Sequence, residues 1–202
     1  MSQKFKSLKN DKETKLQDIL QVALKMFARY GYKKTTIEDI AQEMGMTKSN
    51  IYFYVANKKD LYEKTVGNEL IQWRDTIGRE VEQVEDIVEK FRIMVSRAFE
   101  YLFSHKDLHT IVVNDPGIFT LSRDQDRFLE INLGAMQVIR MVLQQGVSQG
   151  RFYPVDIDVT TDLLFSIYIM FLIKTSVASE IQSVSRMVEA GTELILRGLC
   201  AP

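Results

Sequence analysis

Apolar residues recur every three or four positions along most of this chain, which is the spacing of one face of an α-helix. No segment carries the strict alternation of apolar and polar residues that is typical of a half-buried strand. We therefore expect an all-α protein. The pattern predicts helices at about residues 14–30, 37–44, 47–55, 58–82, 84–104, 107–113, 122–149, 156–177 and 183–199.

The stretch TTIEDIAQEMGMTKSNIYFYVANKKDL, residues 35–61, predicts two short helices joined by a tight turn. Thr47 and either Thr35 or Thr36 are residue types that cap the start of a helix. Gly45 stands where the first helix must stop, and glycine takes the left-handed conformation without a Cβ clash. The stretch therefore indicates a helix-turn-helix.

The second of these short helices divides into an inner and an outer face. Ile51 and Val55, four residues apart, are expected to point inward. Asn57 is expected to cap the next helix, whose first turn carries Lys58 and Lys59. Lysines there oppose the helix dipole, and a nearby phosphate would account for them. The outer side chains are of types that bind base edges and phosphates. The candidate DNA-contacting residues are Lys34, Thr36, Thr47, Lys48, Ser49, Asn50, Tyr52, Tyr54 and Lys58.

This segment resembles the N-terminal domain of TetR-family transcriptional regulators. The family's motif, A-x-x-x-G-[VM]-[ST]-x-x-x-[LI]-Y-x-[YH]-F-x-x-K-x-x-L, stands here with one departure, Val55 in place of the usual Phe. The likeness is specific over roughly the first quarter of the chain. It implies a homodimer that binds operator DNA and holds a small-molecule ligand in a helical body. The matching residues are Ala41, Gly45, Met46, Thr47, Ile51, Tyr52, Tyr54, Lys58 and Leu61.

Charge also separates the chain into two parts. Residues 1–60 hold 12 Lys and Arg against 7 Asp and Glu, whereas residues 61–202 hold the remaining 14 and 20. A basic head on an acidic body suits a protein whose head alone meets DNA. We expect a tail and helix-turn-helix domain at residues 1–57 and a helical effector-binding and dimerisation domain at residues 58–202. The lysines before Asp11 predict either a solvated tail or a basic arm that touches DNA.

Composition excludes several other classes of protein. Cys200 is the single cysteine, so no internal disulfide is possible. The N-terminus has no apolar core of a signal peptide. The longest apolar run, Leu163 to Ile173, is far short of the roughly 20 residues that span a bilayer. We expect a cytoplasmic protein without membrane contact.

Large, deformable side chains in the body predict an apolar ligand site, although such side chains also fill ordinary cores. The family resemblance favours the ligand site, for a fatty-acyl or aromatic effector. The candidate ligand-binding residues are Phe91, Met94, Phe99, Phe103, Phe128, Met136, Tyr168 and Phe171.

The last two helices carry a pattern that suits a twofold interface. Residues 163–173 are apolar nearly all round, which predicts a helix buried on more than one side. A buried core helix and half of a four-helix dimer interface both explain this pattern, and the family resemblance implies the dimer. The candidate interface residues are Ile169, Ile173, Met187, Val188, Gly191, Leu194 and Ile195.

Enzyme chemistry finds little support in the sequence. His105 and His109 have a spacing that suits one metal ion, but they straddle a predicted helix break and no cysteine joins them. We expect neither a metal site nor a cofactor nor a catalytic constellation. Two functions remain: a ligand-responsive repressor, or a helical interaction module whose head binds a protein partner.

Overall fold

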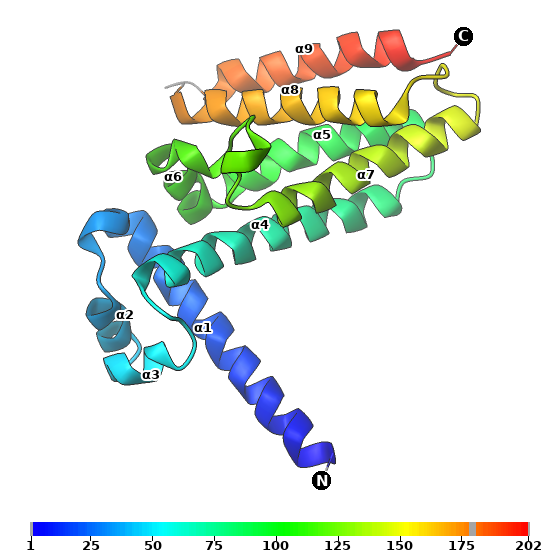
Figure 1. The fold of residues 1–202 in the computed structure, drawn as a ribbon. Coiled ribbons are helices and arrows are strands. Elements are labelled where there is room, and N and C mark those ends of the chain that lie inside the picture. The colour runs from blue at the N-terminus through cyan, green and yellow to red at the C-terminus, as the bar shows by residue number, and fades with distance from the viewer. Residues whose placement is uncertain (1, 178–180, 202) are drawn as a thin grey trace. The chain divides into compact units, whose positions relative to one another are not determined.

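The computed structural model describes residues 2–177 and 181–201. This part of the chain is built from helices (Figure 1). Phe152 and Cys200 form an isolated β-bridge. The expected all-α fold is thus confirmed. The helices are α1 (Ser2–Lys34), α2 (Ile37–Glu43), α3 (Lys48–Tyr52), α4 (Lys58–Glu82), α5 (Ile87–Ser104), α6 (Lys106–Asn114), α7 (Leu129–Ser148), α8 (Ile157–Val177) and α9 (Ile181–Leu199), with 3-10 turns η1 (Pro116–Ile118) and η2 (Arg123–Gln125).

The chain forms two compact units, the head (residues 1–69) and the body (residues 70–202). The division falls inside α4, so the first turns of this helix pack with the head and its remainder packs with the body. The domain boundary expected from sequence, between residues 57 and 58, lies at the start of the same helix. A continuous helix therefore belongs to both units.

The caps of the helix-turn-helix are those that the sequence predicts. The Thr36 hydroxyl accepts the Asp39 N–H (3.1 Å), and the Asp39 carboxylate accepts the Thr36 N–H (2.9 Å), which is a capping box. Gly45 has φ +61° and ends α2. The Thr47 hydroxyl accepts the Asn50 N–H (3.3 Å) at the start of α3. Ile51, on the inner face of α3, is completely buried, as expected.

Helix α1 is longer than predicted. Its backbone is helical from Ser2, whereas the sequence predicted a helix only from about residue 14. Residues 2–13 contain no proline or glycine and hold four lysines, which are good helix formers, so no helix-breaking residue stops the helix there. The side chains of Lys4, Lys6 and Lys9 lie outside the described part of the chain.

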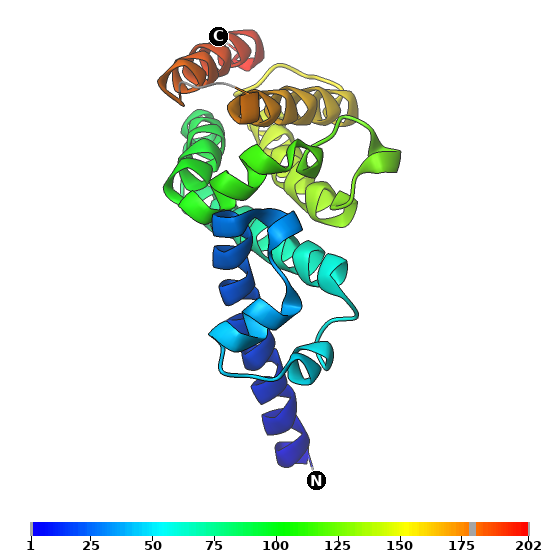
Figure 2. The same cartoon turned by 90° about the vertical axis from the view of Figure 1, so that its left-hand side faces the viewer.

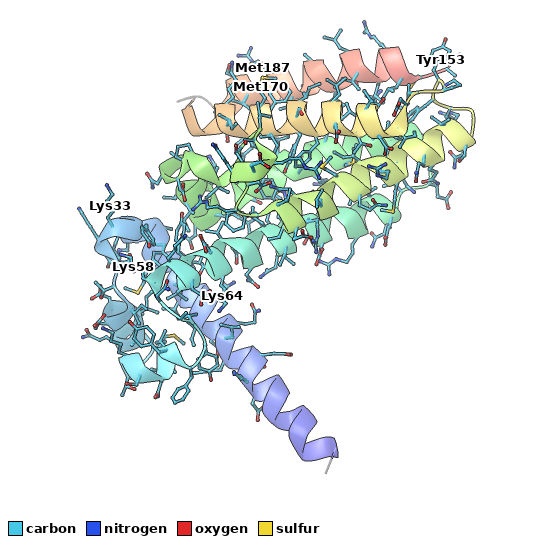
Figure 3. All side chains as sticks on the ribbon, viewed as in Figure 1. Lys33, Lys58, Lys64, Tyr153, Met170 and Met187 are labelled. Carbon is cyan, nitrogen blue, oxygen red and sulfur yellow. The ribbon has the colours of Figure 1, made fainter. Side chains whose placement is uncertain are left out.

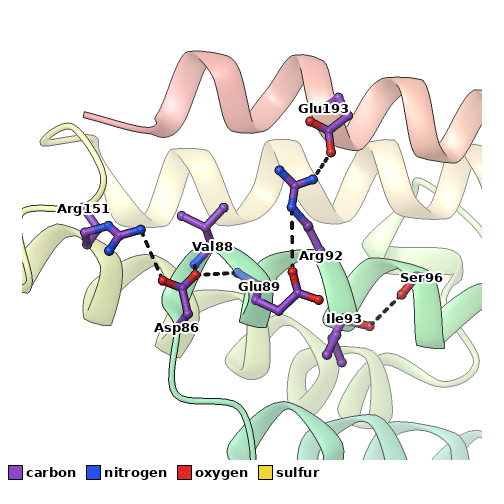
Figure 4. Close-up of polar contacts among 8 residues, drawn as sticks. All are labelled: Asp86, Val88, Glu89, Arg92, Ile93, Ser96, Arg151 and Glu193. Carbon is purple, nitrogen blue, oxygen red and sulfur yellow. Dashed lines mark hydrogen bonds and ion pairs between the residues drawn. The ribbon is translucent and has the colours of Figure 1, made fainter. Parts of the chain in front are cut away.

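In the body, α5 contacts α7 and α9, and α8 contacts the same two helices. The four helices therefore enclose a common centre, which Figure 2 shows from a second side. Asp86 caps α5 by accepting the N–H groups of Val88 (3.0 Å) and Glu89 (2.9 Å), and its other oxygen meets Arg151 at 3.2 Å (Figure 4). An ion pair between Arg92 and Glu193 joins α5 to α9.

Two predicted helix starts in the body are wrong. The cap at Asp86 delays the start of α5 from the expected residue 84 to Ile87. Helix α7 starts at Leu129 instead of about residue 122. The Asp126 carboxylate accepts the Phe128 N–H and the Asn132 side-chain amide, both at 2.8 Å. These local bonds give the backbone an alternative to the helix.

None of the helices in the described residues combines the length and the apolar character that crossing a membrane requires.

Candidate DNA interface and ligand cavity

The outer face of α3 carries most of the candidate DNA-contacting side chains. Lys48, Ser49 and Asn50 are exposed, and Tyr52 keeps 43% of its surface accessible. Lys48 is paired with Glu38 of α2, and its ammonium also lies 5.7 Å from the centre of the Tyr52 ring. This pairing raises the pKa of Lys48 and lowers that of Glu38. A phosphate that binds Lys48 must therefore compete with an exposed carboxylate for its ammonium group.

Other candidate residues have roles inside the head. Thr36 and Thr47 use their hydroxyls as helix caps. Lys58 donates to the carbonyl of Lys33 (3.3 Å), and Figure 3 labels both lysines. The Lys58 ammonium also lies 4.5 Å from the centre of the Tyr32 ring. Lys58 thus binds the last turn of α1, which explains its position at the start of α4 without a phosphate.

Three further residues of the head complete this surface. Lys34 is exposed, as expected for a DNA contact, and Tyr54 is half-buried. The Tyr54 carbonyl accepts a hydrogen bond from Lys64 (3.1 Å), so its backbone is fixed to α4. Phe53 was not among the candidates, yet it is 76% exposed and lies three and four residues after Asn50 and Ser49. Its position in the row of aromatics was visible, but its exposure depends on how α3 packs.

A cavity of about 120 Å³ lies inside the body. Its walls come from α4, α5, α7, α8 and α9, together with Phe119 of the segment after η1. The volume is close to that of an engineered apolar cavity that binds benzene, so a longer ligand either widens the cavity or extends past its edge. Trp73 of α4 lines the cavity and stacks on Tyr101 of α5, with ring centroids 5.8 Å apart.

The predicted ligand residues divide into two groups. Phe91, Met94, Phe99, Tyr168 and Phe171 line the cavity. The other three lie outside the cavity lining. Phe103 packs edge-on against His109 (5.8 Å), Phe128 is buried at the start of α7, and Met136 is half-buried on α7. Lining residues that the sequence did not single out include Leu70, Trp73, Arg74 and Ile77 of α4, and Asn132 and Ala135 of α7.

The cavity wall contains few polar groups. Thr192 donates its hydroxyl proton to the Val188 carbonyl (2.8 Å), and the Asn132 amide nitrogen donates to Asp126 (2.8 Å). Burial raises the pKa of Tyr168, which therefore remains a neutral phenol. Arg74 carries the one charged side chain among the described residues of the wall. The cavity thus suits an apolar ligand with a small polar part.

The predicted dimer residues also fall into two groups, buried or cavity-lining residues and exposed residues. Ile169 and Val188 are buried within their own chain, at 1% and 6% exposure, so they cannot form a contact surface. Val188, Gly191 and Ile195 line the cavity, and Ile173 is half-buried. Met187 (40%) and Leu194 (70%) remain exposed on α9. Exposed apolar residues of α8 that the prediction omitted are Val159, Leu163 and Met170 (Figure 3 labels Met170 and Met187).

The two histidines do not share a site. His105 is exposed and stacks on Tyr101, whereas the Nε2 atom of His109 is buried. Burial lowers the pKa of His109. Within residues 2–177 and 181–201, no group of three or more His, Cys, Asp or Glu side chains is arranged to hold a metal ion.

A helix-turn-helix head joined to a helical body with an internal cavity is the architecture of a DNA-binding regulator. Residues 19–65 match the family model of the bacterial regulatory proteins of the tetR family. The chain is 29% identical over 153 residues to the HTH-type transcriptional repressor KstR2 of Mycolicibacterium smegmatis, covering 73% of this chain and 71% of the relative. These matches support a TetR-family transcriptional regulator.

Solved structures agree on the fold. A TetR-family regulator from Pectobacterium atrosepticum superposes with a TM-score of 0.80 at 18% identity, covering 96% of this chain and 97% of its own. FadR of Bacillus subtilis, solved in complex with stearoyl-CoA, gives a TM-score of 0.74 at 18% identity, covering 90% and 98%.

Proposed function

We propose that this protein is a ligand-responsive repressor that binds operator DNA as a homodimer and releases it when an apolar effector enters the body. The observation that carries this proposal is that α4 belongs to both units. Its first turns pack with the head, and Leu70, Trp73, Arg74 and Ile77 of the same helix line the cavity. A ligand between α4 and the other helices acts on the element that continues into the head.

The chemistry of the cavity supports an effector with an apolar body, of fatty-acyl or aromatic type. Phe91, Phe99 and Phe171 supply most of the aromatic wall. A similar protein, FadR of Bacillus subtilis, was solved with a fatty-acyl thioester. The protein would act in the cytoplasm, where bacterial operator DNA is accessible.

The exposed apolar residues of α8 and α9 support the homodimer. Val159, Leu163 and Met170 recur along α8 at spacings of four and seven, so they share one side of that helix. Met187 and Leu194, seven residues apart, share one side of α9. Large apolar side chains left exposed on neighbouring helices favour contact with a second copy. A dimer would also present two heads to successive major grooves, about 34 Å apart.

Selection of operator DNA from a random pool, followed by gel shifts, tests the proposal. We expect selection of a palindrome and binding that weakens steeply with salt, because phosphate contacts release counterions. Asn50→Ala should change the preferred base at one position of each half-site, since Asn50 is exposed on α3. Glu43→Ala, an exposed change at the end of α2, is the control.

The alternative is that the head binds a protein partner. In that case the selection would return no consensus, and wild-type and Asn50→Ala protein would bind DNA alike.

A further inference from the structure

We propose that the effector is an amphipathic anion whose charged group is bound by Arg74 at the edge of the cavity. This inference rests on the proposed ligand-responsive function and specifies its ligand. A cavity with apolar walls and one cationic side chain selects an apolar body that ends in a carboxylate or a phosphate.

The position of Arg74 gives it access to both the cavity and solvent. Arg74 is a lining residue, yet its side chain keeps 28% of its surface exposed. A charged ligand group there would bind the guanidinium without losing all of its hydration. Because the penalty for burying a charge falls with partial hydration, this edge is a favourable place for an ionised group.

The Arg74 guanidinium has N–H donors that do not bind Asp75. Its Nε and Nη2 atoms bind the same oxygen of Asp75, at 2.8 and 2.7 Å. The Nη1 atom instead lies over Gly134 of α7, and a Cβ atom at position 134 would be only 2.7 Å from it. Glycine therefore allows the guanidinium to lie directly against α7. The contacts to Asp75 use Nε and Nη2, which leaves the two N–H groups of Nη1 for an anion.

Asp75 competes with such an anion. It is half-exposed and adjacent to Arg74 in sequence, so its carboxylate lies near any anion that binds the guanidinium. Removing its charge should strengthen anion binding, whereas removing the arginine should abolish the preference for anions. These opposite effects distinguish a ligand site from a merely structural ion pair, whose loss would act in the same direction for both variants.

Isothermal titration calorimetry with matched ligands tests the proposal. The probes are octanoate, 1-octanol and octanoyl-CoA, titrated into the full-length protein at neutral pH. We expect wild-type protein to bind octanoate at least about tenfold more tightly than 1-octanol. Arg74→Gln should remove this difference and leave the affinity for 1-octanol within about twofold. Arg79→Gln, an exposed arginine on the same helix, should retain the difference, and Asp75→Asn should increase it.

Comparison of octanoyl-CoA with octanoate shows whether Arg74 binds a phosphate or a carboxylate. If octanoyl-CoA binds more tightly than octanoate and loses this advantage in Arg74→Gln, the phosphates are the bound group. If only octanoate depends on Arg74, the free carboxylate is the bound group.

Equal affinity of wild-type protein for octanoate and 1-octanol, with both releasing operator DNA, overturns the anion site and leaves the proposed function standing. A preference for octanoate that persists in Arg74→Gln also overturns it. If none of the three probes binds, the acyl effector of the proposed function fails together with this inference.

Discussion

Single residues in this protein often have a structural task where the sequence suggested a binding task. Lys58 is the clearest example. A lysine in the first turn of a helix is unfavourable for the helix dipole, which suggested a phosphate partner. The structure instead gives Lys58 a carbonyl of α1 and the face of Tyr32. Both partners lie more than twenty residues away in sequence, so local pattern could not reveal them.

Substitution of Lys58 separates the two roles. Lys58→Gln loses the cation–π contact with Tyr32 and should destabilise the head by about 0.5–1 kcal/mol. A phosphate role would in addition lower the slope of log affinity against log salt by about one. Thermal unfolding and gel shifts at several salt concentrations measure the two effects. Lys59→Gln is the control, because Lys59 is exposed and pairs only at 3.7 Å with Glu63. An unchanged melting temperature would contradict the structural role.

His109 should make the stability of the body depend on pH. Burial lowers its pKa in the folded state below the ordinary value of 6.5, so the unfolded chain binds the proton more tightly. The stabilisation is present above about pH 6.5 and is lost as the pH falls towards the lowered pKa. Wild-type protein should therefore lose more thermal stability between pH 7.5 and 5.5 than His109→Phe. If the melting temperatures of the two proteins fell equally over this pH range, His109 would not be the cause of the pH dependence.

At the scale of elements, the accuracy of prediction follows the range of the interactions. The helix-turn-helix was predictable because Thr36, Gly45 and Thr47 act within three or four residues. The start of α7 was predicted wrongly because the Asp126 carboxylate accepts hydrogen bonds from Phe128 and Asn132. These bonds compete with the helical conformation of the residues before Leu129. The α4 wall of the cavity was missed for a different reason. Which face of α4 meets the cavity depends on the placement of four other helices, and no local pattern records it.

Glycines on α7 and α4 give a matched test of helix packing. A Cβ atom at Gly146 would lie 2.1 Å from the ring of Phe152, which is buried at 1% exposure. Gly146→Ala should destabilise the body by at least about 2 kcal/mol, because the ring has no space to move. At Gly78 the nearest atom is 4.0 Å away, so Gly78→Ala should stabilise α4 by about 0.5–1 kcal/mol. Denaturant unfolding measures both, and a neutral Gly146→Ala would contradict the packing described here.

At the scale of the whole molecule, the structure changes the choice of residue for testing the proposed dimer. Gly191 would have been the natural target from sequence, but it faces the cavity, where the Phe171 ring would lie 3.5 Å from a new Cβ atom. Leu194 is 70% exposed on α9, so Leu194→Arg should give a monomer without disturbing the core. Leu121→Arg is the matched control, since Leu121 is 63% exposed outside α8 and α9. Analytical ultracentrifugation at micromolar concentration measures both, and a monomeric wild-type protein would refute the dimer.

The proposed coupling between ligand and DNA is the property that needs both units. A ligand can release the operator only if it binds the DNA-competent and incompetent arrangements with different affinity. Such a difference should arise at α4, because α4 forms one wall of the cavity of about 120 Å³ and a longer ligand that widens the cavity moves this wall. Trp73, the one tryptophan of the chain, lines this wall and stacks on Tyr101.

Titration of acyl compounds of increasing length should therefore change the emission of Trp73 and release a labelled operator with the same midpoint. The effect should grow with length, because a short compound fits the cavity as it stands and leaves α4 in place. Tyr101→Leu, which removes the stacking partner, should alter the emission change and leave the release of DNA intact. If a compound binds and changes the emission fully while operator affinity stays constant, that compound does not shift the equilibrium between the DNA-competent and incompetent arrangements. If every compound that binds behaved so, α4 would not couple the cavity to the head.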